Sequence, residues 1–183
     1  MSVEHGERLR DPEFCLRKAL AFLKSEWLKP EIGFVACLLE DSGSYVITTN
    51  IVNSKGMILH AENRAVSQFE SQYGQLSSSS KAVVTLSPCV EDSPRRIGQS
   101  CSSILLNHGV KNIHFGLMHE KQGSMETYMQ MGFSPSLSTD PNIIKPCKRL
   151  LDFYIANKET IYSNLDAWVA IKKANEKIVF NGL

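Results

Sequence analysis

The sequence lacks any long apolar stretch and any strong excess of one charge. No run approaches the roughly 18–20 apolar residues that a membrane-spanning helix needs. The formal net charge is +1, which excludes the global basic field of many nucleic-acid-binding proteins and leaves only a local basic patch open. The N-terminus has no apolar core like that of a signal peptide and instead carries charges at Glu4, Glu7, Arg8 and Arg10. We therefore expect a cytoplasmic protein that makes no use of a membrane.

Cysteines are few and odd in number. Five cysteines in 183 residues argue against a disulfide framework. We interpret Cys15, Cys37 and Cys147 as small buried apolar residues. The length suits one compact domain, and we predict a single domain over 1–183. Its core is expected at about 12–155, followed by a C-terminal helical extension at 156–183.

Hydrophobic periodicity predicts helices and strands that alternate along the chain. This order favours an α/β fold with a mostly parallel sheet covered on both faces. The serine tract 77–80 and residues 90–100 are expected to be loops. The predicted elements are a helix at 11–28, a hairpin of strands at 33–40 and 45–52, a helix at 60–74, a strand at 81–89, a short helix at 101–110, a strand at 112–119, a short helix at 124–131, a last strand near Ser136–Thr139 or Asn142–Ile144, and one or two helices from Pro146 to about Ile178.

Two segments carry residues that suit a catalytic metal. His60-Ala61-Glu62 opens a predicted helix, and Pro88-Cys89 closes a predicted buried strand shortly before Cys101 opens the next helix. Zinc accepts one imidazole and two thiolates and keeps a fourth position for water in catalytic sites. Residues at a first helical turn can all reach an ion lying off the helix end. We therefore predict Zn²⁺ bound by His60, Cys89 and Cys101.

The same segments supply a proton carrier. Zinc held by three ligands makes water a nucleophile at neutral pH, and Glu62 is expected to move the protons of the reaction. The helix dipole at Cys101 is expected to lower the pKa of its thiol. The order His-x-Glu followed by Pro-Cys and a second cysteine is the signature of zinc deaminases.

The segments HAENRAV, LSPC and CSSILLNHGVKNIHFG, in this order, resemble the zinc-dependent cytidine, deoxycytidylate and tRNA-adenosine deaminase superfamily over roughly residues 14–155. The resemblance implies a three-layer α/β/α sandwich with a five-stranded mixed sheet. It also implies hydrolytic deamination of a nucleobase amine, with a cytosine-type nucleoside or nucleotide slightly favoured. A histidine as first ligand is more similar to the tRNA-adenosine and deoxycytidylate branch.

The resemblance also implies substrate contacts. Family members often have a substrate-binding asparagine about ten residues before the first ligand, which here is Asn50, with Asn53 as second choice. Ala61 and Pro88 stand inside the two motifs and are expected beside the substrate. Val52 stands where ribose-binding cytidine deaminases tend to have glutamate, which disfavours free cytidine.

One departure from the family is large. Family members usually have two residues between the two cysteines, whereas this chain has eleven, Val90 to Ser100. Closing the longer loop costs only about 1.5 kcal/mol, whereas a zinc site contributes on the order of 10 kcal/mol. The insertion therefore permits the site and places a loop at its mouth. Its Arg95 and Arg96 are either solvated or placed to bind a substrate phosphate.

Several alternatives stay open at this level. The substrate could be adenine, guanine or a base in RNA or DNA, although near-neutral charge disfavours a long polyanion. The chain could be a non-catalytic zinc-bearing module, or a deaminase exported to act in another cell. The C-terminal helices could cap a monomer or form the interface of a homo-oligomer. An aromatic residue of these helices, Phe153 or Tyr154, could also lie near the pocket. His108, His114 and His119 are interpreted as strand or surface residues.

Overall fold

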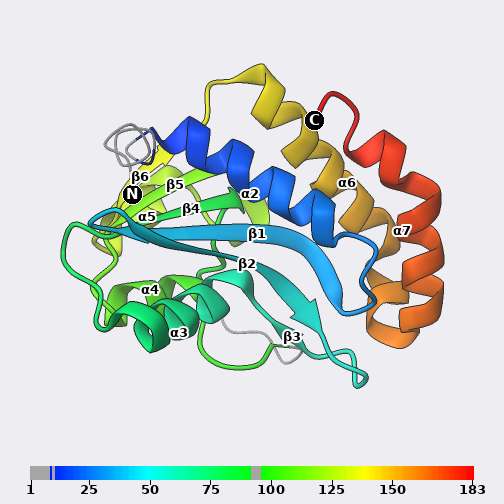
Figure 1. Ribbon diagram of the computed structural model, residues 1–183, viewed down its shortest axis with the longest axis horizontal. Helices are drawn as coiled ribbons and strands as arrows, with labels where there is room; N and C mark the ends of the chain where they lie inside the picture. Colours follow the sequence, from blue (N-terminus) through cyan, green and yellow to red (C-terminus); the bar gives the residue numbers. More distant parts are fainter. Residues whose placement is uncertain (1–8, 10, 92–95) are drawn as a thin grey trace.

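A computed structural model describes residue 9 and residues 11–91 and 96–183 (Figure 1). A mixed sheet of six strands in the order β3-β2-β1-β4-β5-β6 crosses the described part of the chain. The β1–β2, β1–β4 and β2–β3 pairs are antiparallel, and the β4–β5 and β5–β6 pairs are parallel. The strands are β1 (Ile32–Asp41), β2 (Ser44–Val52), β3 (Ile58–Leu59), β4 (Lys81–Leu86), β5 (Asn112–Leu117) and β6 (Ser134–Leu137).

The expected mixed three-layer sandwich is confirmed, but the mostly parallel sheet is wrong. The chain enters the sheet through a hairpin, and a hairpin makes neighbours antiparallel. Helical crossovers that keep strands parallel connect only β4, β5 and β6. The sixth strand, beyond the five expected, is the two-residue β3 at the sheet edge.

The hairpin turn follows from two residues. Asp41 pairs with Ser44, so Ser42 and Gly43 alone connect the strands. Both have positive φ, 52° and 87°, which is the conformation of the tight turns that match strand twist. Glycine adopts this conformation freely, and Ser42 is the one non-glycine residue with positive φ among the described residues.

Capping residues explain the helix boundaries. The Asp11 and Asp140 carboxylates accept backbone hydrogen bonds at the starts of α2 and α6, and each of these helices has proline at its first position. The helix expected from Pro146 thus begins earlier and includes Asn142–Ile144, which is therefore not a strand. The helices are α2 (Pro12–Glu26), α3 (Ala61–Tyr73), α4 (Cys101–Asn107), α5 (Met125–Gln130), α6 (Pro141–Ser163) and α7 (Leu165–Val179), with a 3-10 turn at Glu120–Gln122.

The helices form two layers around the sheet. In Figure 1, α2 and α6 lie on one face, with α7 beyond α6, and α3 and α4 lie on the other. Two apolar clusters fill the spaces between the layers, one under α2, α6 and α7 and the other under α3, α4 and α5. The first cluster contains Cys15 and Cys147, and the second contains Cys37, so these cysteines are buried as predicted.

A buried lysine ties α7 to the start of β1. Lys172 has no solvent exposure, and its Nζ donates to the carbonyls of Lys29 at 2.7 Å and Ile32 at 2.9 Å. The same ammonium lies 5.6 Å and 5.5 Å from the ring centroids of Trp27 and Trp168. Burial lowers the pKa of Lys172 to about 8. Sequence reasoning predicted the apolar face of this helix but missed the lysine within it.

No helix in the described residues is long and apolar enough to cross a membrane.

Candidate metal centre and active-site cavity

Three elements bring the predicted zinc ligands together. His60 is the residue before α3, Cys101 is the first residue of α4, and Cys89 follows the end of β4. The two helices pack against each other beside the sheet. His60 makes no side-chain cap to its own helix, so its imidazole is available to the two cysteines.

The ligand atoms have the spacing of a tetrahedral metal site. His60 Nδ1 lies 3.7 Å from the Cys89 sulfur and 3.2 Å from the Cys101 sulfur. All three atoms lie within 4.8 Å of one another. Zinc bonds of about 2.0 Å to nitrogen and 2.3 Å to sulfur would separate the nitrogen and a sulfur by about 3.6 Å. The residues therefore fit a zinc ion without rearrangement of the backbone.

Cys89 is held by backbone and aromatic contacts. The N–H of Cys101 donates to the Cys89 sulfur at 3.3 Å, and the N–H of Ser102 donates to the Cys89 carbonyl at 3.1 Å. On the other side, the hydroxyl of buried Tyr128 in α5 donates to the carbonyl of Pro88. The start of α4 therefore stabilises the sulfur of Cys89.

This arrangement corrects the expectation for Cys101. A hydrogen bond from Cys101, with smaller contributions from His60, lowers the pKa of the Cys89 thiol to about 4. Burial instead raises the pKa of the Cys101 thiol well above its usual value. The predicted lowering of the Cys101 pKa is therefore wrong, because burial of this thiol outweighs the helix N-terminus. The cysteine with the lowered pKa is Cys89, mainly through its contact with the Cys101 side chain and only to a small extent through the Cys101 amide.

Glu62 lies beside the ligands and is almost fully buried, with 2% of its surface exposed. Burial raises the pKa of its carboxyl group above the usual value. Its Oε2 has no hydrogen-bond partner among the described residues. A buried carboxylate oxygen without a hydrogen-bond partner costs stability. Its presence therefore fits a side chain that exchanges protons with a bound molecule.

Arg96 reaches the same centre from the insertion between the cysteines. Its guanidinium lies 3.3 Å from His60 Nδ1, contacts the sulfur of Cys89, and lies 3.4 Å from the sulfur of Cys101. Burial alone would lower the pKa of Arg96, but the two cysteines raise it. The guanidinium of Arg96 thus contacts all three predicted ligand atoms.

A cavity of about 160 Å³ adjoins the centre. It is lined by His60, Cys89, Glu62, Ala61 and Arg96 from the centre, and by Phe34, Val35, Asn50, Ile58, Leu86, Ser87, Glu91, His119 and Tyr154 around it. The structure therefore places two of the predicted ligands, His60 and Cys89, together with Glu62 at one cavity. The third ligand, Cys101, is fully buried, and its sulfur lies 3.2 Å from His60 Nδ1.

The predicted substrate contacts are distributed unevenly around this cavity. Ala61 and Asn50 line it, and the Asn50 side-chain oxygen accepts hydrogen bonds from the N–H groups of Phe34 and Val35, both at 2.8 Å. Pro88 is buried and is not among the described residues that line the cavity, so the expected contact of Pro88 with the substrate is not found there. Arg95 lies outside the described residues.

Sequence reasoning missed part of the cavity wall. His119, interpreted as a strand or surface residue, lines the cavity, and burial lowers its pKa. Its N–H donates to the hydroxyl of Ser87 at 2.8 Å. Both residues follow neighbouring parallel strands, β4 and β5, whose carboxyl ends meet at one edge, so strand direction was the signal that could have found them.

Aromatic residues form another part of the wall. Phe34 and Tyr154 stack with their ring centroids 3.9 Å apart and an angle of 15° between their planes. Tyr154 thus lies at the pocket, whereas Phe153 packs in the core with Trp27 and Trp168. The sequence predicts Phe34 only as part of a buried strand, because the helix that packs over this residue cannot be predicted from the local sequence.

Comparison with known proteins gives the family. Residues 9–117, more than half of the chain, match the model of the cytidine and deoxycytidylate deaminase zinc-binding region. The chain belongs to this family, and Zn²⁺ is its metal, with His60, Cys89 and Cys101 as the fitting ligand set. No curated protein matches the sequence.

Solved structures share the fold at low sequence identity. A diaminohydroxyphosphoribosylaminopyrimidine deaminase/5-amino-6-(5-phosphoribosylamino)uracil reductase from Thermotoga maritima matches 78% of the chain at 16% identity and a TM-score of 0.57. This chain spans only 40% of that protein. The dCMP deaminase of cyanophage S-TIM5, in complex with dCMP and dUMP, matches 75% of the chain and 99% of its own length, at 19% identity and a TM-score of 0.54.

A third structure, a variant of NE0047 in complex with 8-azaguanine, matches 80% of the chain and 85% of its own length, at 17% identity and a TM-score of 0.54. These likenesses establish the deaminase fold.

Proposed function

We propose that the protein hydrolytically deaminates a cytosine-type nucleotide, with zinc bound by His60, Cys89 and Cys101 and protons carried by Glu62. The observation that supports this most is the buried carboxylate oxygen of Glu62, which has no partner among the described residues and lines a cavity next to the three ligands. A zinc site that served only the fold would not require such a group.

The residues divide the chemistry between them. Bound zinc supplies the Lewis acidity that makes water a nucleophile at neutral pH. Glu62 accepts a proton from that water and delivers protons to the ring nitrogen and to the departing ammonia. Its burial supports this role, because burial raises the pKa of the carboxyl group and so makes the carboxylate a better proton acceptor.

The cavity wall supports binding of a planar base. Phe34 and Tyr154 stack on each other and both line the cavity, so they provide an apolar aromatic wall against which a base can pack. Asn50, fixed through its oxygen by β1, is placed to donate from its amide nitrogen, and Ser87 and His119 provide further polar groups. Ala61, which lines the cavity between His60 and Glu62, is placed beside the base.

Phosphate on the substrate is favoured by the insertion. Arg96 is the arginine that lines the cavity among the described residues, and Arg95 adjoins it in sequence. The Thermotoga maritima and cyanophage proteins are both named for nucleotide substrates. A purine base is the second candidate, because the NE0047 variant was crystallised with 8-azaguanine.

The test is ammonia release from dCMP, CMP, their nucleosides and guanine, with wild-type protein and Glu62→Gln. We expect the wild type to deaminate a pyrimidine nucleotide fastest. Glu62→Gln should lose at least about 100-fold in kcat while it keeps one zinc per chain. Turnover by E62Q at the wild-type rate, or no ammonia from any compound with zinc-loaded wild type, would contradict the proposal.

A further inference from the structure

The guanidinium of Arg96 contacts the three atoms that would bind the metal. The first guanidinium nitrogen, Nη1, is within hydrogen-bond distance of Nδ1 of His60, at 3.3 Å, and contacts the sulfur of Cys89. The second, Nη2, lies 3.4 Å from the sulfur of Cys101. A positively charged side chain from the loop between the two cysteines thus contacts all three ligands.

The contact with His60 and a metal bond exclude each other. Arginine is only a donor, so Nδ1 of His60 must be the acceptor in this contact. An imidazole nitrogen offers a single lone pair in the ring plane, and a metal ion uses that same lone pair. Zinc can therefore bind His60 through this atom only after Nη1 has left.

The surroundings of Arg96 allow the side chain to move while its backbone stays. Its backbone forms a bridge with Ile58 of β3, and the N–H of Ile97 donates to the Ile58 carbonyl at 2.8 Å. Nη2 also donates to the side-chain oxygen of Asn63 at 3.1 Å. The Nε of Arg96 is buried without a partner among the described residues, so the guanidinium is not fully satisfied in this position.

We propose that Arg96 is an internal cation that zinc displaces: it neutralises the ligands until zinc binds, and it then turns into the adjoining cavity that it already lines. This inference rests on the proposed zinc function. It implies that the metal binds this chain more weakly than the three ligands alone would allow, because each binding event must break the contacts of the guanidinium with His60, Cys89 and Cys101.

Zinc affinity of the full chain tests the competition directly. Wild type, Arg96→Gln and Arg17→Gln are stripped with a chelator and titrated with zinc against a chromophoric chelator. Arg17 is an exposed arginine that pairs with Asp140 away from the cavity, so R17Q controls for the loss of one charge. Since the guanidinium makes several charge-assisted contacts, R96Q should bind zinc about tenfold more tightly or better, and R17Q should match wild type.

Thermal stability provides a second readout. The stripped R96Q protein should melt at a lower temperature than stripped wild type, and saturating zinc should bring the two melting temperatures together. Lysine keeps the charge but cannot reach His60 and Asn63 at once, so Arg96→Lys should bind zinc with intermediate affinity. If stripped R96Q does not fold, the R96K affinity decides, and a value equal to wild type overturns the inference.

The outcomes separate this inference from the proposed function. Equal or weaker zinc binding by R96Q than by R17Q overturns the displaceable cation and leaves the deaminase proposal standing. Failure of every variant, wild type included, to bind zinc overturns both.

Discussion

At the scale of single residues, Glu62 and Asn50 line the same cavity from different elements, α3 and β2. The His-x-Glu spacing predicts a carboxylate beside the metal ligand His60, and the structure places the buried Glu62 carboxylate at the cavity. Asn50 was chosen through the family resemblance. It lines the cavity, and the structure adds that its oxygen holds two N–H groups of β1, a structural role that the sequence did not suggest.

Tyr154 gives a prediction at this scale. Tyr154→Ala removes one ring of the stack on the cavity wall, and base–aromatic stacking contributes about 1–3 kcal/mol. We therefore expect KM for the preferred nucleotide to rise about tenfold with a smaller change in kcat, measured by steady-state ammonia release.

Tyr154→Phe keeps the ring and should keep the wild-type KM. Tyr73→Ala removes an exposed tyrosine of α3 that does not line this cavity, and it serves as the matched control. An unchanged KM in Y154A would mean that the base does not pack on this wall.

Elements were easiest to predict where local chemistry marks their ends. Asp11-Pro12 and Gly74 marked the start of α2 and the end of α3 because a capping carboxylate, a proline and a positive-φ glycine act within one turn. The predicted start of the helix at Pro146 is too late, because Asp140 and Pro141 cap α6 five residues earlier in the chain. The antiparallel pairing of β1 with β4 could not be read locally, because it depends on which distant strands pair.

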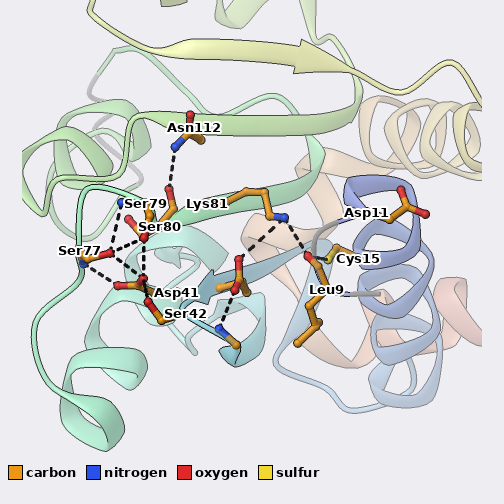
Figure 2. A network of polar contacts seen from close by, with 12 residues as sticks. Leu9, Asp11, Cys15, Asp41, Ser42, Ser77, Ser79, Ser80, Lys81 and Asn112 are labelled. Carbon is orange, nitrogen blue, oxygen red and sulfur yellow. Dashed lines mark hydrogen bonds and ion pairs between the residues drawn. The ribbon is translucent and has the colours of Figure 1, made fainter. Parts of the chain in front are cut away.

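The serine tract 77–80 is an ordered connection, although the sequence indicated only a loop. Figure 2 shows Asp41, at the end of β1, surrounded by serine hydroxyls and a backbone N–H. Its carboxylate accepts from Ser77 N at 2.6 Å, from the Ser77 hydroxyl at 2.7 Å, and from Ser79 and Ser42 at 3.3 Å and 2.9 Å. This carboxylate therefore fixes the loop that leads into β4.

Asp41→Asn tests this connection. Burial alone would raise the pKa of Asp41, but the hydrogen bonds from Ser77, Ser42 and Ser79 outweigh it and lower the pKa. We expect a loss of about 2 kcal/mol in the free energy of unfolding at pH 7, because charge-assisted hydrogen bonds are removed. Urea unfolding measures this loss. Asp152 forms an exposed ion pair with Lys148, so Asp152→Asn is a control whose stability should change little.

The sign of the pH dependence follows from the lowered pKa. The folded state keeps the Asp41 carboxylate charged to lower pH than the unfolded chain does, so the stabilisation is present at neutral pH. It should be lost as the pH falls below about 3.8, the ordinary value. The difference between wild type and D41N should therefore shrink in acid, and a constant difference would contradict this account.

At the scale of the whole molecule, the sequence predicted the composition of the site better than its surroundings. Two motifs separated along the chain identified His60, Cys89 and Cys101 because a zinc site restricts both residue type and position within an element. The position of Arg96 among the ligands could not be predicted, because it depends on how an insertion folds back on β3. The buried Lys172 was missed for the same reason, since only tertiary packing supplies its carbonyl partners.

The central claim is that these three side chains bind one zinc ion. Elemental analysis of the purified full chain by mass spectrometry, with Cys37→Ser as a control for loss of a buried cysteine outside the site, measures it most directly. We predict one zinc per wild-type and C37S chain, and less than a tenth of that in C89S and in C101S. A folded wild-type protein that contains no zinc after growth and dialysis in excess zinc, or full zinc content in C101S, would contradict the account.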